Sequence, residues 1–310
     1  MLYACEKNNI MIGCRLVLPS SVYSLLRMKS GHVAIVGRSN AGKSTLLNAL
    51  VGSKIAITTP KPQTTRRPVS GIITRPEGQV VLVDTPGVMQ KAKDPLTKKL
   101  LQFAKETLRG VDAIMYVADA TRSIGDEEKQ GLKLIDEVEK PKLLVINKID
   151  EPEAKNFIDY YRDLQGQFDN YVEVSAKTGA NTDLIEKWLF EQMPEGEAMY
   201  PAFQMSDMAN EDWIAELIRE KLFLRLREEV PYSTHVKVNE VATRDNGSVY
   251  VNATIYTNNE RYKPMIIGRG GQGIKEIGQS VRNELEAVSG KKHFIELEVA
   301  VDPHWLEQLV

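Results

Sequence analysis

Residues 37–44 of this 310-residue chain form a glycine-rich stretch, Gly37-Arg38-Ser39-Asn40-Ala41-Gly42-Lys43-Ser44. The stretch directly follows an apolar run at 33–36 and opens a helical pattern. Two glycines with four residues between them, followed by Lys and Ser, are typical of a phosphate-binding loop. We expect Lys43 to neutralise the β- and γ-phosphates and Ser44 to bind Mg²⁺. The nucleotide-binding residues predicted here are Gly37, Arg38, Ser39, Asn40, Ala41, Gly42, Lys43, Ser44 and Thr45.

Strand and helix patterns alternate after this loop begins. Strands buried on both faces are predicted by apolar, β-branched runs at 33–36, 80–83, 114–117, 143–146 and 172–174. Between them lie helical patterns at 96–108, 126–138, 154–168 and 183–193. The alternation predicts an α/β domain at 28–193 with a doubly wound, mainly parallel sheet. A linker at 194–208 follows it.

Three later motifs, each at a predicted strand end, concern the base and the metal. They are Asp84-Thr85-Pro86-Gly87, Asn147-Lys148-Ile149-Asp150 and Ser175-Ala176-Lys177. Asp150 can accept hydrogen bonds from guanine N1–H and N2–H₂, whereas adenine offers no such pair. We expect Asn147 at the Hoogsteen edge, the Lys148 stem over the base and the Ala176 backbone at O6. The motifs predict GTP rather than ATP.

A polar, proline-interrupted segment at 58–68 is interpreted as a mobile effector loop. Its Thr65, or the neighbouring Thr64, is the candidate second Mg²⁺ ligand. Asp84 can hold Mg²⁺ through water, and the Gly87 N–H can sense the γ-phosphate. The predicted metal-binding residues are therefore Ser44, Thr65 and Asp84, and the predicted catalytic residues are Lys43, Ser44, Thr65 and Gly87.

Val88 follows Gly87, at the place where many signalling GTPases have a Gln that orients the attacking water. Since Val88 cannot hydrogen-bond water, we expect slow intrinsic hydrolysis. Positioning and charge neutralisation should supply most of the catalysis, and Arg38 is a candidate for charge stabilisation.

The remaining residues, 209–310, predict a small α+β domain. Asn210 is a candidate cap for a first helix, and strands are predicted at 235–243 and 248–257 around the turn Asp245-Asn246-Gly247. Two helical pieces then enclose the turn Gly268–Gly271, and a last strand is predicted at 294–301.

The turn Gly268–Gly271 lets a sugar–phosphate backbone approach closely, as in RNA-binding KH domains. Residues 261–292 hold seven basic and three acidic side chains, whereas 201–260 hold six basic and ten acidic ones. The basic surface is therefore confined to the region around the glycine turn, 261–292, as a groove for single-stranded RNA requires. The predicted RNA contacts are Ile267, Gly268, Arg269, Gly270, Gly271, Ile274, Lys275, Lys263 and Arg282.

Composition adds the expected location of the chain. Its formal net charge is -2, and its only cysteines are Cys5 and Cys14, which excludes a disulfide framework. No apolar run reaches the roughly 18 residues of a membrane span, so a cytoplasmic protein is expected. A monomer is also expected. Residues 1–27 are interpreted as a disordered extension, or Met28 is the true start; a transit peptide is the alternative.

The chain resembles the Era family of bacterial ribosome-assembly GTPases from Met28 to its end. The resemblance rests on the phosphate-binding loop, Gln63-Thr64-Thr65-Arg66, the three later motifs and the loop beginning Ile267-Gly268. Ser39 and Ala41 stand where this family usually has Pro and Val. The resemblance implies a type II KH domain, binding to the 3′ end of 16S rRNA, a role in maturation of the 30S subunit and peripheral membrane association. It also implies K⁺ at Asn40, as in related GTPases.

Two other classes of function stay open from the sequence. The chain could be a KH-type RNA-binding module with a near-inert GTPase domain, because Val88 predicts weak hydrolysis in either case. It could also be a membrane-linked signalling GTPase, although the sequence has no lipidation motif.

Overall fold

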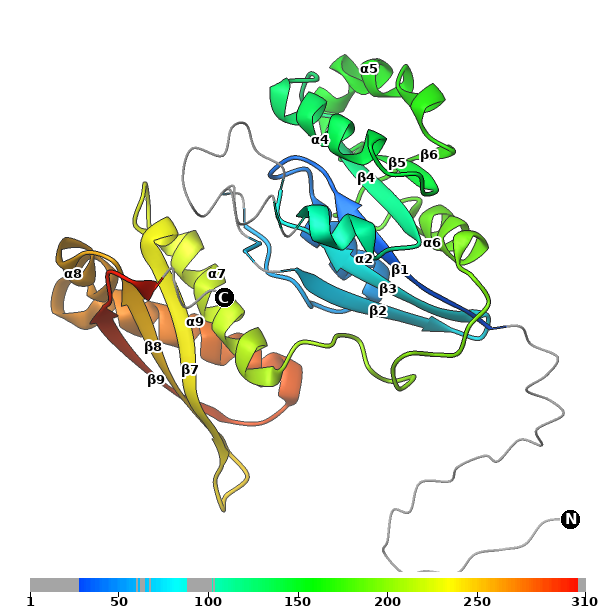
Figure 1. The fold of residues 1–310 in the computed structure, drawn as a ribbon. Helices are drawn as coiled ribbons and strands as arrows, with labels where there is room; N and C mark the ends of the chain where they lie inside the picture. Colours follow the sequence, from blue (N-terminus) through cyan, green and yellow to red (C-terminus); the bar gives the residue numbers. More distant parts are fainter. Residues whose placement is uncertain are drawn as a thin grey trace, which may run out of the picture.

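The computed structural model describes residues 28–59, 61, 65–66, 68–87, 102 and 104–305 (Figure 1). The predictions for residues 1–27, Thr64 and Val88 lie outside the described residues. Within the described ranges, no helix combines the length and hydropathy that a membrane span requires.

The first domain contains a six-stranded sheet of order β2-β3-β1-β4-β5-β6. Its strands are β1 (Lys29–Val36), β2 (Val69–Arg75), β3 (Gly78–Asp84), β4 (Ala113–Asp119), β5 (Lys142–Asn147) and β6 (Asn170–Glu173). All neighbours pair in parallel except β2, which pairs antiparallel to β3. The predicted doubly wound, mainly parallel sheet is confirmed.

Helices cover both faces of this sheet (Figure 1). The helices are α2 (Lys43–Val51), α4 (Asp126–Asp136), α5 (Ile158–Arg162) and α6 (Thr182–Gln192). Because successive side chains of a strand point to opposite faces, Val33 and Ile35 of β1 pack with α2 and α6. Ala34 and Val36 pack in the second core, with α4 and α5.

The predicted helix at 154–168 is wrong as a single element. The chain forms a 3₁₀ turn at Pro152–Asn156, the short α5, and a second 3₁₀ turn at Gln165–Gln167. Phe157 interrupts the first junction with φ -128°, outside the helical region. Gly166, a weak helix former, lies in the second 3₁₀ turn. The described residues of the helix predicted at 96–108, which are 102 and 104–108, are helical.

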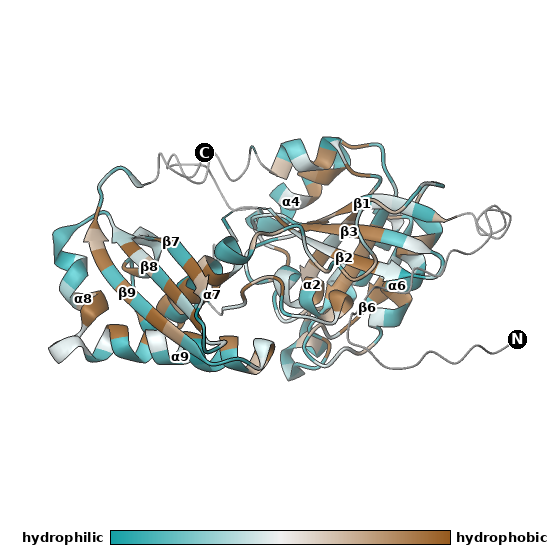
Figure 2. Ribbon diagram, turned by 90° about the horizontal axis from the view of Figure 1, so that it is seen from below, coloured by the Kyte–Doolittle hydropathy of each residue, from teal (hydrophilic) through white to brown (hydrophobic). Residues whose placement is uncertain are grey.

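The second domain has a three-stranded sheet of order β7-β8-β9 with helices on one face (Figures 1 and 2). Its elements are α7 (Asn210–Arg225), β7 (Thr234–Thr243), β8 (Val249–Thr257), α8 (Lys263–Ile267), α9 (Gln272–Ser289) and β9 (His293–Val301). Strand β8 pairs antiparallel to β7 and parallel to β9. Figure 2 shows apolar residues repeating along the strands and along α7 and α9. The predicted order of helices and strands is confirmed.

One helix boundary differs from its prediction. The N-cap of α7 is Ala209, and Asn210 is its first helical residue, with no side-chain cap. The N–H of Trp213 donates to the carbonyl oxygen of Ala209, so the first turn begins one residue earlier than the side-chain pattern indicated.

Residues 194–208 lie against the first domain. The N–H of Ile72 in β2 donates to the carbonyl oxygen of Met205, and Ser206 forms an isolated bridge with Gly71. The segment thus covers part of the exposed edge of the sheet. The limits proposed for the two domains and the linker remain predictions.

Candidate functional site

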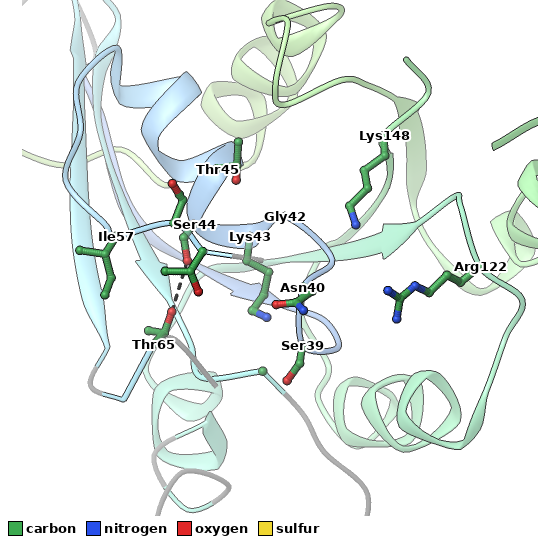
Figure 3. A pocket seen from close by; sticks show the side chains of 13 residues that line it. Ser39, Asn40, Gly42, Lys43, Ser44, Thr45, Ile57, Thr65, Arg122 and Lys148 are labelled. Atoms are coloured by element: carbon green, nitrogen blue, oxygen red, sulfur yellow. Dashed lines mark hydrogen bonds between the residues drawn. The ribbon is translucent and has the colours of Figure 1, made fainter. Parts of the chain in front are cut away.

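The glycine-rich loop lies at the carboxyl end of β1 and borders a pocket of about 350 Å³ (Figure 3). Lys43 is buried there, and its Nζ donates to the carbonyl oxygens of Gly37 (3.1 Å) and Arg38 (2.9 Å). Burial lowers the pKa of Lys43. Gly42 has φ 96°, and a Cβ there would lie 2.3 Å from Asn147 Nδ2, so only glycine fits. The residues lining the pocket are Ser39, Asn40, Gly42, Lys43, Ser44, Thr45, Ile57, Thr58, Thr59, Thr65, Gly87, Arg122 and Lys148.

Arg38 departs from its predicted role. Its side chain is buried and lies 3.6 Å from Glu128 of α4. Tyr116 donates to Glu128 Oε1 at 3.1 Å, and burial raises the pKa of Glu128. Only the Arg38 backbone borders Lys43, so the expected charge stabilisation by its guanidinium is wrong. The side chain ties the loop to α4.

Three oxygen-bearing side chains meet beside Lys43. Ser44 Oγ donates to Asp84 Oδ2 at 2.6 Å, and Thr65 Oγ1 lies 3.2 Å from Ser44 Oγ and 3.3 Å from Asp84 Oδ2 (Figure 3). Asp84 is fully buried, burial raises its pKa, and its Oδ1 has no hydrogen-bond partner. Hard oxygen ligands around one carboxylate fit Mg²⁺, which keeps phosphate and water oxygens for its other positions. The predicted metal ligands are therefore brought together.

The base-recognition motifs border a second pocket, of about 440 Å³, which includes Asp150, Lys148 and Ala176. Asn147 braces this region: its Nδ2 donates to the Ala41 carbonyl oxygen, and its Oδ1 accepts from the Ala176 N–H, both at 2.9 Å. The Ala176 N–H, expected at guanine O6, is thus already bound, because Asn147 lies between the two loops. In the same way, Asn147 directs its amide to the backbone rather than to a Hoogsteen edge.

The other residues of these motifs line the two pockets or hold the turns beside them. Lys177 Nζ lies 3.8 Å from Asp150 Oδ2. Thr85 hydrogen-bonds the Ile35 carbonyl oxygen, which holds Pro86 and Gly87 near the loop. A Cβ on Gly87 would lie 2.7 Å from Ser39 Oγ. Ser175 Oγ accepts the Thr178 N–H, which closes the turn beside Ala176.

The sequence analysis missed Asp119 at the end of β4. Its Oδ2 accepts from Lys148 Nζ at 2.7 Å, and its Oδ1 accepts from the hydroxyl and N–H of Thr121. Burial alone would raise the pKa of Asp119, but the hydrogen bonds from Lys148 and Thr121 lower it below its usual value. Asp119 positions the Lys148 stem. Its place just after the strand predicted at 114–117, on the edge shared with the other motifs, was the signal for it.

The glycine turn of the second domain joins α8 to α9. Gly268, Gly270 and Gly271 have φ 75°, 58° and 78°. A Cβ on Gly268 would lie 2.7 Å from the Gly273 nitrogen, whereas nothing lies within 4 Å of one on Gly270 or Gly271. The two later glycines therefore leave open space in front of the α9 N-terminus, which favours phosphate.

A groove of about 500 Å³ runs between α9 and the edge strand β9. It is lined by Ile274, Lys275 and Arg282 from the predicted set. Ile267, Gly268, Arg269, Gly270, Gly271 and Lys263 lie in the glycine turn or on α8, outside the groove lining. Sequence reasoning missed Arg244, Tyr250 and Phe294, which complete the groove from β8, β9 and the β7–β8 turn.

Comparisons with known proteins agree with this geometry. A family model described as "50S ribosome-binding GTPase" matches residues 32–148, and a KH domain model matches 229–306. GTPase Era of Halothermothrix orenii is 40% identical over 281 residues, which is 90% of this chain and 95% of the relative. This chain belongs to the Era family. The Era protein of Carboxydothermus hydrogenoformans is 41% identical over 280 residues, 89% of this chain and 94% of its own.

Two solved Era structures match both domains. An Aquifex aeolicus Era variant bound to GDP and AlF₄⁻ superposes with a TM-score of 0.84 at 38% identity, covering 90% of this chain and 95% of the other. Era in complex with MgGDPNP and nucleotides 1506–1542 of 16S ribosomal RNA also gives 0.84, at 39% identity and the same coverage. The protein is a GTPase of the Era family with a P-loop domain followed by a KH domain, as predicted.

Proposed function

We propose that this protein is a GTP-driven switch that binds the 3′ end of 16S rRNA and assists assembly of the 30S subunit. The relative crystallised with MgGDPNP and 16S rRNA supports this. The observation that carries the proposal is that the effector loop predicted at 58–68, together with Lys54 just before it, contacts both the nucleotide pocket and the KH domain. A nucleotide-dependent change in this segment would therefore act on RNA binding.

Helix α7 holds Lys54, just before the effector loop, and Thr58, the first residue of the loop. The Trp213 indole donates to the Lys54 carbonyl oxygen at 3.1 Å, and the Thr58 N–H donates to Glu220 Oε1 at 3.0 Å. Lys54 Nζ forms ion pairs with Glu220, at 2.7 Å, and with Glu284 of α9. Helix α9, which follows the glycine turn, therefore contacts the GTPase domain through Glu284.

The end of the segment enters the KH domain through Arg66. Its guanidinium donates to the carbonyl oxygens of Thr234 (2.6 Å) and Tyr232 (2.8 Å) and lies 5.1 Å from the Trp305 ring centroid. Burial lowers the pKa of Arg66 to about 9, so it stays charged at neutral pH. The preceding residue, Thr65, points to Ser44 and Asp84.

The adjacent residues Thr65 and Arg66 thus contact the proposed metal site and the KH domain, respectively. In the proposed switch, Thr65 would bind Mg²⁺ while GTP is present and would be released once the γ-phosphate is lost. The neighbouring Arg66 then moves relative to Thr234 and Tyr232, which changes how the KH domain packs against the GTPase domain. Small-angle scattering with GDP and with a non-hydrolysable GTP analogue tests this, and identical profiles would contradict it.

The cofactor assignment belongs to the same proposal. Ser44, Thr65 and Asp84 would hold Mg²⁺, which neutralises charge on the transferred phosphoryl group. Lys43 would neutralise the β- and γ-phosphates, and the Gly87 N–H would sense the γ-phosphate. Asn40 lines the pocket with φ 63° and is the proposed K⁺ contact. Faster hydrolysis in KCl than in NaCl, lost in Asn40→Ala, would support that contact.

RNA binding is tested with a fluorescent RNA copying the 16S 3′ end, in the GTP-analogue and GDP states. Gly270→Asp adds negative charge at the proposed phosphate clamp, and Gly270→Asn is its matched neutral control, because both residues tolerate φ > 0 better than most. Gly268 is less suitable, since any side chain there meets the Gly273 backbone. Tight, GTP-dependent binding that collapses in Gly270→Asp but not Gly270→Asn is expected. Equal, weak binding throughout would contradict the proposal.

The assembly role and the membrane association need separate measurements. Single-turnover hydrolysis is expected to become faster when 30S subunits or the RNA are added, whereas an unchanged rate would favour a near-inert GTPase domain.

Peripheral membrane association predicts that the protein is found in the floated fraction of a liposome assay, and its absence from that fraction would contradict the proposed membrane association. A single monomer mass in light scattering is expected for the free protein.

A further inference from the structure

We propose that Phe294, Tyr250 and Arg244 form a stacking platform for one RNA base, beyond the nucleotides held by the glycine turn. The platform lies in the groove between α9 and β9. This inference rests on the proposed RNA-binding function and adds a subsite to it.

The two rings lie side by side on neighbouring strands. Tyr250 of β8 pairs in register with Phe294 of β9. Their chain neighbours Val251 and Ile295 pack in the hydrophobic core under the helices. Because side chains alternate along a strand, both rings leave the sheet on the face opposite this core, and they border the groove at the open edge of the sheet beside β9.

Arg244 joins the rings into one surface. Its guanidinium carbon lies 4.9 Å from the centroid of Tyr250 and 4.9 Å from that of Phe294. Arg282 of α9 approaches Phe294 from the groove side, at 5.9 Å. The Tyr250 hydroxyl donates to Glu296, which fixes the ring. Aromatic rings and guanidinium planes are the surfaces on which single-stranded RNA bases stack.

Exposure and charge favour RNA as the occupant. Phe294 is 42% exposed although it is a large apolar residue on a strand. The cations Arg244, Arg282 and Lys275 line the same groove, with Glu296 as the acidic residue beside them. A flexible, negatively charged chain that carries flat bases matches both features.

Spacing places the platform one step past the clamp. From Gln272, where α9 begins, to Arg282 the helix rises about 15 Å. At about 3.4 Å per stacked nucleotide, this corresponds to between four and five nucleotides. A KH glycine turn clamps about four. The platform should therefore take the next base along the strand.

The test compares the binding of RNAs of four and eight nucleotides from the 16S 3′ end to Phe294→Leu, which keeps an apolar side chain but removes the flat ring. Phe203→Leu, at a residue 86% exposed in the linker segment, is the matched control. We expect Phe294→Leu to weaken the eight-nucleotide RNA about 10-fold and the four-nucleotide RNA little. 2-Aminopurine at the fifth position should be quenched by the wild type and the control, and less by Phe294→Leu. Melting curves confirm that each variant folds.

The outcomes separate this inference from the function beneath it. If Gly270→Asp abolishes binding while Phe294→Leu leaves the affinity of both RNAs and the quenching unchanged, the platform is wrong and the RNA function stands. An equal loss for both RNA lengths also contradicts the platform. If the wild type binds neither RNA, both proposals fail together.

Discussion

The nucleotide pocket and the RNA groove hold their polar groups in opposite ways. Lys43, Asp84 and Asn147 are buried and bonded to neighbouring loops before any ligand is considered. In the groove, Arg244, Lys275 and Phe294 are exposed, and Arg244 stacks on the Phe294 ring. Buried polar groups must be paired in a fixed geometry, whereas exposed ones tolerate change. The pocket should therefore respond sharply to single substitutions, and the groove should respond gradually and to salt.

Among single substitutions in the pocket, Asp150→Asn is expected to change nucleotide affinity most. The amide would donate where the carboxylate accepts, so guanine would lose its paired bonds and xanthine would gain one. Two hydrogen bonds to a charged group predict a loss of GTP affinity of about 10³-fold, with preference moving toward xanthosine triphosphate. Competition binding measures this. Glu153→Gln is the control, because it removes a neighbouring negative charge from the same pocket. Unchanged GTP affinity in Asp150→Asn would contradict the guanine assignment.

The second test concerns the buried pair of Arg38 and Glu128. Arg38→Met leaves the Glu128 carboxylate buried without its counter-ion, which should lower the free energy of unfolding by about 3 kcal/mol. The double variant Arg38→Met with Glu128→Gln removes both charges and keeps an acceptor for Tyr116. It should recover most of the loss in urea denaturation. A double variant as unstable as the single one would show that the pair does not act as a unit.

Most of the residues predicted to bind the nucleotide line the two pockets, because the chemistry of each motif is local in sequence. A phosphate-binding loop needs its glycines, Lys43 and Ser44 within one turn of chain, and each base motif follows one strand end. The wrong predictions concern the direction in which a side chain points. The motif does not say that Arg38 turns toward α4 or that Asn147 bonds Ala41 and Ala176, because those partners come from other elements.

Only those groove residues that are close together in the sequence were predicted. The glycine turn and the α9 residues Lys275 and Arg282 are close in sequence and show as a basic cluster. Arg244, Tyr250 and Phe294 meet only through the pairing of β8 with β9. Strand register depends on the packing of the whole domain, so no spacing in the sequence reveals this contact. The contacts of Arg66 with Tyr232 and Thr234 could not be predicted either, because these partners lie in the other domain.

The connection between pocket and groove is tested at Arg66. Arg66→Met keeps the stem but removes the hydrogen bonds to Thr234 and Tyr232. Nucleotide affinity should change little, because Thr65 keeps its place beside Asp84. The ratio of RNA affinities in the GTP-analogue and GDP states should fall by about 10-fold, within the usual range of coupling energies. Arg66→Lys should fall between wild type and Arg66→Met, and an unchanged ratio in both variants would remove Arg66 from the switch.

The smallest expected effect is the salt dependence of the groove. Each phosphate contact of single-stranded RNA contributes about 0.7 to the slope of log affinity against log salt. Lys275→Gln should lower the slope by about that amount, since Lys275 pairs with no carboxylate among the described residues. Arg282→Gln should lower it less, because Arg282 already bonds Glu286 at 2.9 Å. Lys187→Gln, an exposed lysine on α6, is the control. Equal slopes in all the variants would mean that the groove does not follow the RNA backbone, whereas a graded series would give Lys275 and Arg282 separate phosphates.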